Sequence, residues 1–389
     1  MTETATADPE PARLAGVLAD ASFVRLVATD DGDALAAAAL LARALRDAGT
    51  PFHVRVDRDP TGAHEAANGR DVTVTVGTTA GTHAVPGAGR PASTTAFAVA
   101  RERGGEPDPV LALAGAVAAG SVPGTDGSGD ALAAAEAAEL VRRRPGVAVP
   151  TADVATGLAA STLLRAPYSG DPEAAQAALA ACSLPAALDD DARRRLASLV
   201  AVDVAGAESA SERSASAVER ALRPYAVVAG AAPVETVGGY ADVLDVLSRA
   251  APGTGVALAL ATAPDDDLRT AALDAWREHG LAAHRALDAA TTGRYDGCVV
   301  ARVDAPASTL PTIARLVRDF RSPEPVAIAV DEVAGELAAA ATEPSELGDA
   351  CQSVAVEFDG EGWGTATRGG VTGTGGATTE ALAALREAL

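Results

Sequence analysis

The chain has 389 residues, 48% of them hydrophobic, and this length predicts more than one hydrophobic core and hence two domains. The formal net charge is -22 and lysine is absent, a composition that suggests a halophilic archaeon, because carboxylates retain water at multimolar salt and self-repulsion is screened there. Its apolar stretches are far shorter than the ~20 residues of a membrane helix and residues 1–11 lack the apolar core of a signal peptide, so we expect a cytoplasmic protein without a membrane partner.

The first half of the chain predicts the alternating strands and helices of a parallel sheet. A buried strand at residues 23–28 leads directly into an alanine-rich and leucine-rich helix at residues 34–48. Further strands are predicted at residues 52–56 and 72–76, at the spacing of βαβ units. Helical segments follow at residues 93–103, 109–119, 130–143 and 173–222. The last segment has helical periodicity without strand signals, and we expect it to contain the connector between two domains.

The second half of the chain predicts another α/β unit. Strands are predicted at residues 225–228, 256–261, 297–303, 326–330, 353–358 and 363–367. Helices are predicted at residues 240–250, 267–289, 308–320 and 378–389. The sequence therefore predicts an α/β protein with a parallel-sheet domain at residues 1–185, a helical connector at residues 186–222 and a smaller α/β domain at residues 223–389.

Three aspartates surround one glycine where the first strand gives way to the first helix. Asp31 and Asp33 flank Gly32, so both carboxylates can face the same point. Ligands of open parallel sheets bind at this edge, and Mg²⁺ and Mn²⁺ prefer oxygen donors of this kind. Asp31 and Asp33 are therefore the predicted metal ligands. The alternative is that Asp30 or Asp33 caps the helix, because a helix N-terminus also favours acidic side chains.

Residues 31–35, Asp-Gly-Asp-Ala-Leu, and the alanine-rich helix after them resemble the first motif of the DHH phosphoesterase superfamily. Residues 91–97, 110–118, 238–244 and 255–260 resemble further segments of its archaeal RecJ-like branch, in the same order along the chain. The resemblance implies a two-lobed DHH-type phosphoesterase fold, in which a DHHA1-like C-terminal domain follows the parallel-sheet domain. It also implies an ancestral active site in the cleft between the lobes.

The sequence departs from the family's pattern at most of the positions that hold metal. No histidine precedes Asp31, residues 77–79 lack the aspartate expected after the third strand, and the Asp-His-His triplet is absent. No carboxylate stands near Gly120, where the fourth motif places an aspartate. Hydrolysis by two metals needs ligands for ions ~3.5 to 4 Å apart, whereas two aspartates would hold at most one hydrated Mg²⁺ or Mn²⁺ weakly. The resemblance therefore implies lost or weak nuclease activity.

A glycine-rich segment and two arginines are predicted to bind phosphate or nucleic acid. Residues 369–376 stand where the family has a Gly-Gly-His loop that contacts substrate phosphate, with Val371 in place of the histidine. Backbone N–H groups just before a helix suit an anion, although a plain turn is the alternative. The two arginines lie near one helical face, and salt bridges to neighbouring carboxylates are their alternative role. The predicted residues are Gly369, Gly370, Gly373, Gly375, Gly376, Arg318 and Arg321.

The histidines and cysteines predict no metal site of their own. His279 and His284 fall five residues apart on one predicted helix, too far round it to share an ion comfortably, and we expect them at the surface. Cys182, Cys298 and Cys351 lie in apolar surroundings without Cys-x-x-Cys spacing. They are predicted to be buried thiols in a reducing compartment.

By resemblance, we expect a RecJ-like protein that associates with nucleic acid as a replication or repair factor. Single-stranded nucleic acid remains an expected partner, because in multimolar salt the net charge reflects the habitat more than the ligand. Some archaeal RecJ-like proteins associate with the GINS complex and the replicative helicase, so these are the expected protein partners. The alternative is an active, divalent-metal-dependent single-strand exonuclease or small-phosphoester hydrolase. A regulatory module that binds a nucleotide in the cleft is the third hypothesis.

Overall fold

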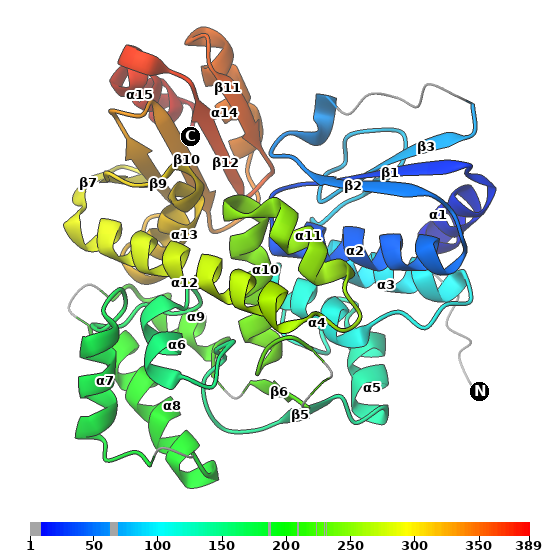
Figure 1. Cartoon of the computed structure of the whole chain (residues 1–389). Helices are drawn as coiled ribbons and strands as arrows, with labels where there is room; N and C mark the ends of the chain where they lie inside the picture. The colour runs from blue at the N-terminus through cyan, green and yellow to red at the C-terminus, as the bar shows by residue number, and fades with distance from the viewer. Residues whose placement is uncertain are drawn as a thin grey trace, which may run out of the picture.

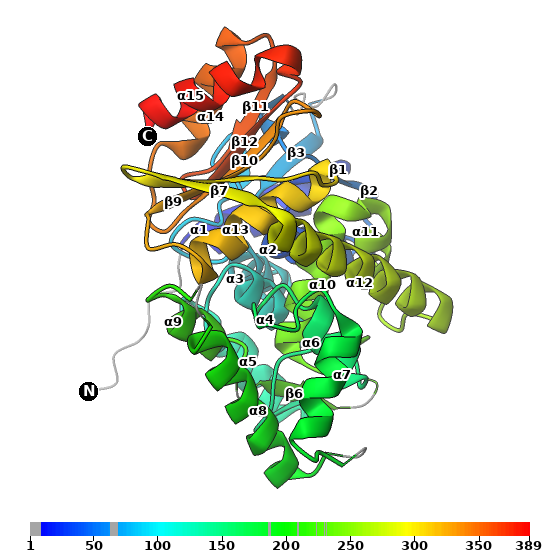
Figure 2. The same ribbon diagram turned by 90° about the vertical axis from the view of Figure 1, so that its left-hand side faces the viewer.

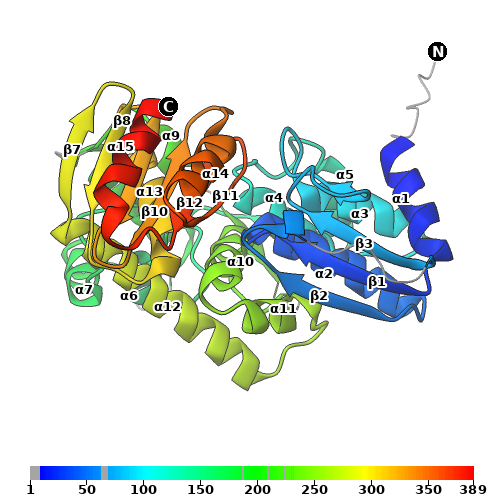
Figure 3. The same cartoon turned by 90° about the horizontal axis from the view of Figure 1, so that it is seen from above.

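The computed structural model describes residues 9–62, 69–185, 188–207, 210–222, 224–228, 230 and 232–389. One sheet from the first quarter of the chain and one from the last quarter lie side by side, with helices packed beneath both (Figures 1 and 3). The predicted α/β fold, with a parallel N-terminal sheet and a separate C-terminal sheet, is therefore confirmed. Among the described helices, none is long and apolar enough to cross a membrane.

The first sheet is parallel and has the strand order β2-β1-β3-β4. Its strands are β1 (Phe23–Ala28), β2 (Phe52–Val56), β3 (Asp71–Val76) and β4 (Ala84–Val85), and a short 3-10 helix, η1 (Pro60–Gly62), follows β2. The first three strands lie where the sequence predicts them. The helices of this region are α1 (Pro9–Asp20), α2 (Gly32–Asp47), α3 (Ala92–Glu102), α4 (Pro109–Ala118) and α5 (Gly129–Ala137).

Helix α2 is buried on most of its surface because eleven of its sixteen residues are alanine or leucine. These small side chains allow neighbouring helices to pack closely against it. A Cβ on Gly115 of α4 would lie 2.5 Å from the Ser93 Cβ and 2.8 Å from the Ala36 Cβ. Only glycine therefore fits where α2, α3 and α4 meet.

Two further helices, α10 (Val237–Ala250) and α11 (Pro252–Leu260), complete the first hydrophobic core. The strand predicted at residues 256–261 was wrong, because this segment forms α11. A short, continuously apolar run does not distinguish a strand from a buried helix, whereas Pro252 in the first turn favours a helix. The predicted domain boundaries at residues 185 and 222 stay a prediction, although α10 and α11, expected in the second domain, pack with the first sheet's helices.

The middle of the chain forms helices that lie below the second sheet (Figure 2). They are α6 (Val154–Ala160), α7 (Pro172–Ala181), α8 (Asp190–Ala205) and α9 (Ser214–Glu219). Strand β5 (Val141–Arg143) precedes these helices in the chain and β6 (Tyr225–Val227) follows them, and the two strands pair in an antiparallel ribbon. The helix predicted at residues 130–143 therefore ends early, since its last three residues are strand β5.

The second sheet has the order β11-β12-β10-β9-β8-β7, with only the β8–β9 pair parallel. Its strands are β7 (Thr291–Tyr295), β8 (Cys298–Arg302), β9 (Val326–Asp331), β10 (Glu336–Ala341), β11 (Glu361–Gly364) and β12 (Arg368–Thr372). Its helices are α12 (Asp266–Ala289), α13 (Leu310–Phe320), α14 (Leu347–Glu357) and α15 (Thr378–Ala388), with short 3-10 helices η2 (Ala307–Thr309) and η3 (Gly375–Ala377). Figure 2 shows α14 and α15 on one face of this sheet and α13 on the other.

Secondary structure in the last hundred residues differs from the prediction at several places. Strand β7 was not predicted, and the strand predicted at residues 363–367 is β11, at residues 361–364. The strand predicted at residues 353–358 was wrong, because these residues belong to the end of α14, where Val354 and Ala355 supply the buried face. Strands β10 and β12 were missed, because one is mostly alanine and the other contains a glycine pair, residue types that are depleted in strands. Both strands are central in the sheet, so burial and pairing outweigh their weak strand propensity.

The two histidines of α12 are buried, which contradicts their predicted place at the surface. His279 Nε2 lies 2.9 Å from the Thr312 Oγ1, and His284 Nε2 lies 2.9 Å from the Ser161 carbonyl oxygen. Burial, followed by nearby arginine charges such as that of Arg165 beside His284, lowers the pKa of both rings to about 3. Both histidines are therefore neutral parts of the core.

Acidification should destabilise the protein through these two histidines. Their pKa is lower in the folded chain than the ~6.5 of the unfolded chain, so the unfolded state binds more protons below that value and the free energy of unfolding falls as the pH drops. From pH 7.5 to 5 we expect a loss of about 2 kcal/mol for each histidine. Urea denaturation gives the free energy of unfolding at pH 7.5 and at pH 5. The difference between the two values should be smaller for His284→Gln than for the wild type. His53→Gln, on an exposed position of β2, should leave the difference unchanged, and a full difference in His284→Gln would contradict this assignment.

Candidate functional site

The predicted metal ligands lie where β1 ends and α2 begins, and Asp31 is the N-cap of that helix. Its Oδ1 accepts a hydrogen bond from the Ala34 N–H at 2.8 Å, and its Oδ2 accepts one from the Thr29 hydroxyl at 2.5 Å. The alternative interpretation, a helix cap within this acidic cluster, is therefore right about the cap but wrong about the residue, because Asp31 and not Asp30 or Asp33 caps α2.

The Asp33 carboxylate is buried and faces the start of α3. Its Oδ2 accepts the Ala92 N–H at 2.6 Å and its Oδ1 accepts the Ser93 N–H at 2.9 Å. Pro91, the N-cap residue of α3, offers no side-chain acceptor, so Asp33 satisfies these N–H groups from another helix. Burial raises the pKa of Asp33 to about 7, and the charge on Asp31 acts in the same direction. Asp33 thus joins α2 to α3.

An arginine from the second sheet contacts the aspartates of the first. Arg368, the first residue of β12, places its Nη2 2.6 Å from the Asp31 Oδ2 and its Nη1 3.1 Å from the Asp30 Oδ1. Arg58 adds a second cation, with its Nε 3.4 Å from the Asp30 Oδ2. Asp30 is almost fully buried, so these two guanidinium groups compensate its charge. The sequence reasoning missed Arg368, whose only signal was its place directly before the predicted glycine segment.

A buried ion pair in α10 lies on the other side of Gly32. Arg249 contacts Asp245 through two bonds, of 2.7 and 3.0 Å, and the Asp245 Oδ1 accepts the Gly32 N–H at 3.2 Å. Burial alone would raise the pKa of Asp245, but the Arg249 cation holds that pKa well below its usual range. A Cβ on Gly32 would lie 2.8 Å from the Asp245 backbone nitrogen, so α10 can approach only because this residue is glycine.

This arrangement does not fit a two-metal centre. Every carboxylate oxygen of Asp31 and Asp33 already accepts a hydrogen bond, and arginines supply the positive charge beside Asp30, Asp31 and Asp245. Within the described part of the chain, no three His, Cys, Asp or Glu side chains converge as metal ligands. A single weakly held ion at Asp31 and Asp33 stays a prediction, and it would require Arg368 to leave.

The predicted phosphate-binding glycines separate into two groups. Gly369 and Gly370 lie inside β12, paired with β10 and β11, so the loop expected for these two residues was wrong. A Cβ on Gly370 would lie 2.5 Å from the Leu337 carbonyl oxygen, which explains this glycine by packing. Gly373 and Gly375 have positive φ values of 76° and 53°, and with Gly376 they form the turn before α15. Their role in binding phosphate stays a prediction.

The two predicted arginines point inward to partners within the protein. Arg318 donates from Nε to the Asp319 Oδ1 at 2.8 Å and from Nη1 to the Ala341 carbonyl at 3.0 Å. Arg321 donates from Nη1 to the Leu287 carbonyl at 2.8 Å and from Nη2 to the Asp288 Oδ1 at 3.0 Å. The geometry thus matches their alternative role in salt bridges, and neither shares a site with Asp31.

Comparison with known proteins identifies a sequence relative from a halophilic archaeon. Residues 290–387 match the family model described as "Uncharacterized protein rrnAC1427, C-terminal domain". The protein rrnAC1427 of Haloarcula marismortui is 46% identical over 368 residues, which cover 92% of this chain and 91% of that protein. The salt-adapted composition agrees with this haloarchaeal relative.

Solved structures of low sequence identity share the fold. CDC45 from Entamoeba histolytica superposes with a TM-score of 0.63 at 8% identity, over 97% of this chain and 98% of that chain. RecJ from Thermus thermophilus in complex with Mn²⁺ superposes with a TM-score of 0.53 at 14% identity, over 100% of this chain and 55% of that chain. An exonuclease RecJ bound to manganese gives 0.51 at 13% identity, over 97% and 94% of the two chains. The two-lobed, RecJ-like DHH fold predicted from the motifs is therefore confirmed.

Proposed function

This chain belongs to the family of the Haloarcula marismortui protein rrnAC1427. We propose that it is a replication or repair factor with lost or weak nuclease activity. The RecJ-like fold and its likeness to CDC45 support a role connected with nucleic acid. Single-stranded nucleic acid, the GINS complex and the replicative helicase are its proposed partners.

The contact of Arg368 with Asp30 and Asp31 is the observation that carries this proposal. Hydrolysis by two metal ions requires carboxylates that are free to bind both ions and to hold a bridging water. Here a guanidinium group from the second sheet lies within 2.6 Å of the Asp31 Oδ2. The positive charge that metal ions supply in a nuclease is supplied by arginine, which has no exchangeable ligand position and activates no water. The scaffold thus keeps its two lobes in contact through this ion pair.

A degradation assay tests the proposal. Pure protein in multimolar KCl, incubated with millimolar Mn²⁺ and an end-labelled single-stranded oligonucleotide, should give no shortening beyond that of Asp31→Ala, because no oxygen of Asp31 is free for a metal. Asp126→Ala, which removes a carboxylate from an exposed turn, is the matched control. Manganese-dependent shortening that Asp31→Ala abolishes and Asp126→Ala retains would instead establish the exonuclease.

The proposed partners require a separate measurement. The tagged full chain, purified from its own cells at their native salt, should retain GINS or helicase subunits. Their absence under conditions in which both are detected in the extract would count against a replisome role, even if the degradation assay gives the expected result.

A further inference from the structure

Arginines gather at one end of this acidic molecule, away from the candidate site. Arg143 and Arg144, at the end of β5, and Arg193 and Arg194, in the first turns of α8, line two adjoining surface pockets. Figure 1 places β5 and α8 at the bottom of the molecule and β12 at the top. The chain's net charge is -22, so a cluster of four arginines from two separate elements stands out as a candidate anion site.

Two of these arginines, Arg143 and Arg144, form no ion pair within the described part of the protein, although the charges of Glu235 and Asp190 act on Arg144, and Arg194 is paired with Asp191. The guanidinium of Arg144 forms no ion pair with any described residue, and Arg143 lies over the Tyr225 ring at 5.6 Å from its centroid. Arg193 reaches Asp190 only at 3.7 Å. Partial burial, and then the charge of Arg193, lowers the pKa of Arg144. A carboxylate bound between Arg144 and Arg193 would accept charge-assisted hydrogen bonds from both guanidinium groups.

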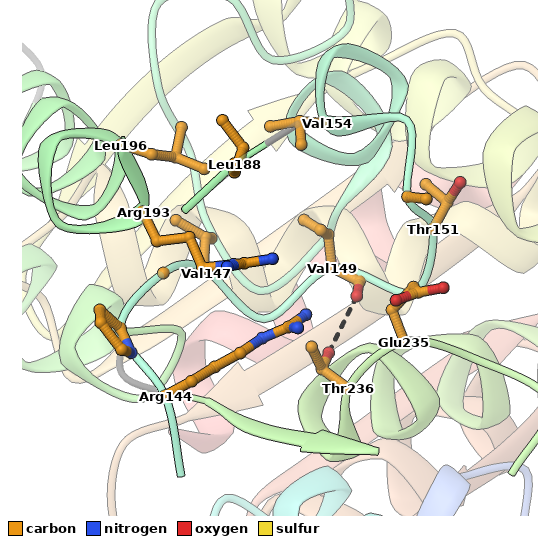
Figure 4. Close-up of a pocket in the computed structure, with 13 residues that line it drawn as sticks. Arg144, Val147, Val149, Thr151, Val154, Leu188, Arg193, Leu196, Glu235 and Thr236 are labelled. Carbon is orange, nitrogen blue, oxygen red and sulfur yellow. Dashed lines mark hydrogen bonds between the residues drawn. The ribbon is translucent and has the colours of Figure 1, made fainter. Parts of the chain in front are cut away.

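The pocket beside these arginines, which we call the Arg144 pocket, has an apolar floor. It encloses about 290 Å³, and Figure 4 shows Arg144 and Arg193 reaching into it while Glu235 lies on the facing side. The apolar side chains around it are Val147, Val149, Val154, Leu188 and Leu196. This volume is just below the range of small-molecule sites, roughly 300 to 1,000 Å³, and suits one large side chain better than a nucleotide.

We propose that the Arg144 pocket binds an acidic peptide segment of a partner protein, with one aliphatic or aromatic side chain on its apolar floor and flanking carboxylates paired to Arg144 and Arg193. Nucleic acid suits the pocket less well. No aromatic side chain lines it for base stacking among the described residues, and contacts to a phosphate backbone weaken steeply in salt. An apolar contact persists in salt, and a carboxylate in direct contact with a guanidinium is screened least.

Peptide binding to the full chain tests this proposal. The probes are fluorescein-labelled dodecapeptides of Asp and Glu with a single variable residue at the centre, measured by fluorescence anisotropy in molar KCl. Peptides with central Leu, Ile or Phe should bind roughly tenfold more tightly than the peptide with central Gly, because only they bury an apolar side chain. Arg144→Ala combined with Arg193→Ala should abolish binding. Val154→Ser, at a half-buried floor position, should weaken only the peptides with an apolar centre.

Arg101→Ala combined with Arg277→Ala is the matched control, because it removes two exposed arginine charges from α3 and α12. Equal affinity for all central residues, or binding that survives the Arg144 and Arg193 changes, would overturn the proposal. So would an absence of binding by every peptide. If an oligothymidylate binds instead, and the same double variant abolishes that binding, the site is a nucleic-acid site. The proposal does not rest on metal chemistry at Asp31, so its failure leaves the proposed function untouched.

Discussion

Transfer from multimolar to about 0.1 M KCl should lower the Tm by roughly 10 °C or more, because the Debye length grows from ~3 Å or less to ~10 Å and carboxylates across the surface then repel one another. The formal net charge of -22 is the cause. Circular dichroism melts over a series of KCl concentrations measure the effect. The steepest change should fall at low salt, where screening varies most with concentration.

A charge-reduced variant separates this repulsion from general effects of salt. Glu136, Glu343 and Glu357 are exposed, and replacing all three with glutamine changes the formal net charge from -22 to -19, since three negative charges are removed. The variant should lose less stability than the wild type on dilution of KCl. An equal loss in both proteins would show that hydration or apolar burial, not repulsion, sets the salt dependence.

Asp242→Ala should destabilise the protein by about 3 to 5 kcal/mol, because it leaves several buried donors without an acceptor. The Asp242 carboxylate of α10 accepts hydrogen bonds from the Ser161 hydroxyl at 3.0 Å, from the Thr162 N–H at 3.1 Å and hydroxyl at 2.5 Å, and from the Trp276 Nε1–H at 2.9 Å. Burial raises the pKa of this carboxyl. It joins α10 to the residues after α6 and to α12, and so connects the first core to the helices beneath the second sheet.

Urea denaturation in multimolar KCl measures this loss. Asp171→Ala, which removes the exposed N-cap of α7, is the matched control and should cost only about 1 kcal/mol. Asp242→Asn keeps one acceptor oxygen, so its free energy of unfolding should lie between those of Asp242→Ala and Asp171→Ala. A free energy of unfolding for Asp242→Ala that equals that of Asp171→Ala would show that the buried network contributes no more than a helix cap.

The sequence predicts the candidate site as far as local signals reach. An apolar strand, three aspartates around a glycine and an alanine-rich helix place Asp31 correctly at the end of β1 and the start of α2. What Asp31 contacts is set elsewhere, since Arg368 lies 337 residues further along the chain. Asp33 likewise accepts N–H groups from residues 59 and 60 positions away. The identity of these partner residues depends on how the helices and the two lobes pack together. The local sequence pattern does not predict that packing.

The errors in the fold have similar physical causes. The alanines of β10 and the glycines of β12 have weak strand propensity, and only their central place in the second sheet makes them strands. The apolar run of α11 fits a buried strand or a buried helix equally well by periodicity. His279 and His284 look like surface residues in sequence, but His279 contacts the buried Thr312 hydroxyl, and His284 contacts the Ser161 carbonyl and Arg165.

The most direct test of the account is a Mn²⁺ titration followed by electron paramagnetic resonance. It shows whether the aspartates at the end of β1 form ion pairs with arginine or bind a metal ion. Titration in multimolar KCl suppresses diffuse binding to the acidic surface. The wild type and Asp31→Ala should leave the same amount of free aqueous Mn²⁺ signal. If the wild type removes one or two equivalents of Mn²⁺ more than Asp31→Ala does, Arg368 yields its place to metal ions and the proposed loss of the hydrolytic centre is contradicted.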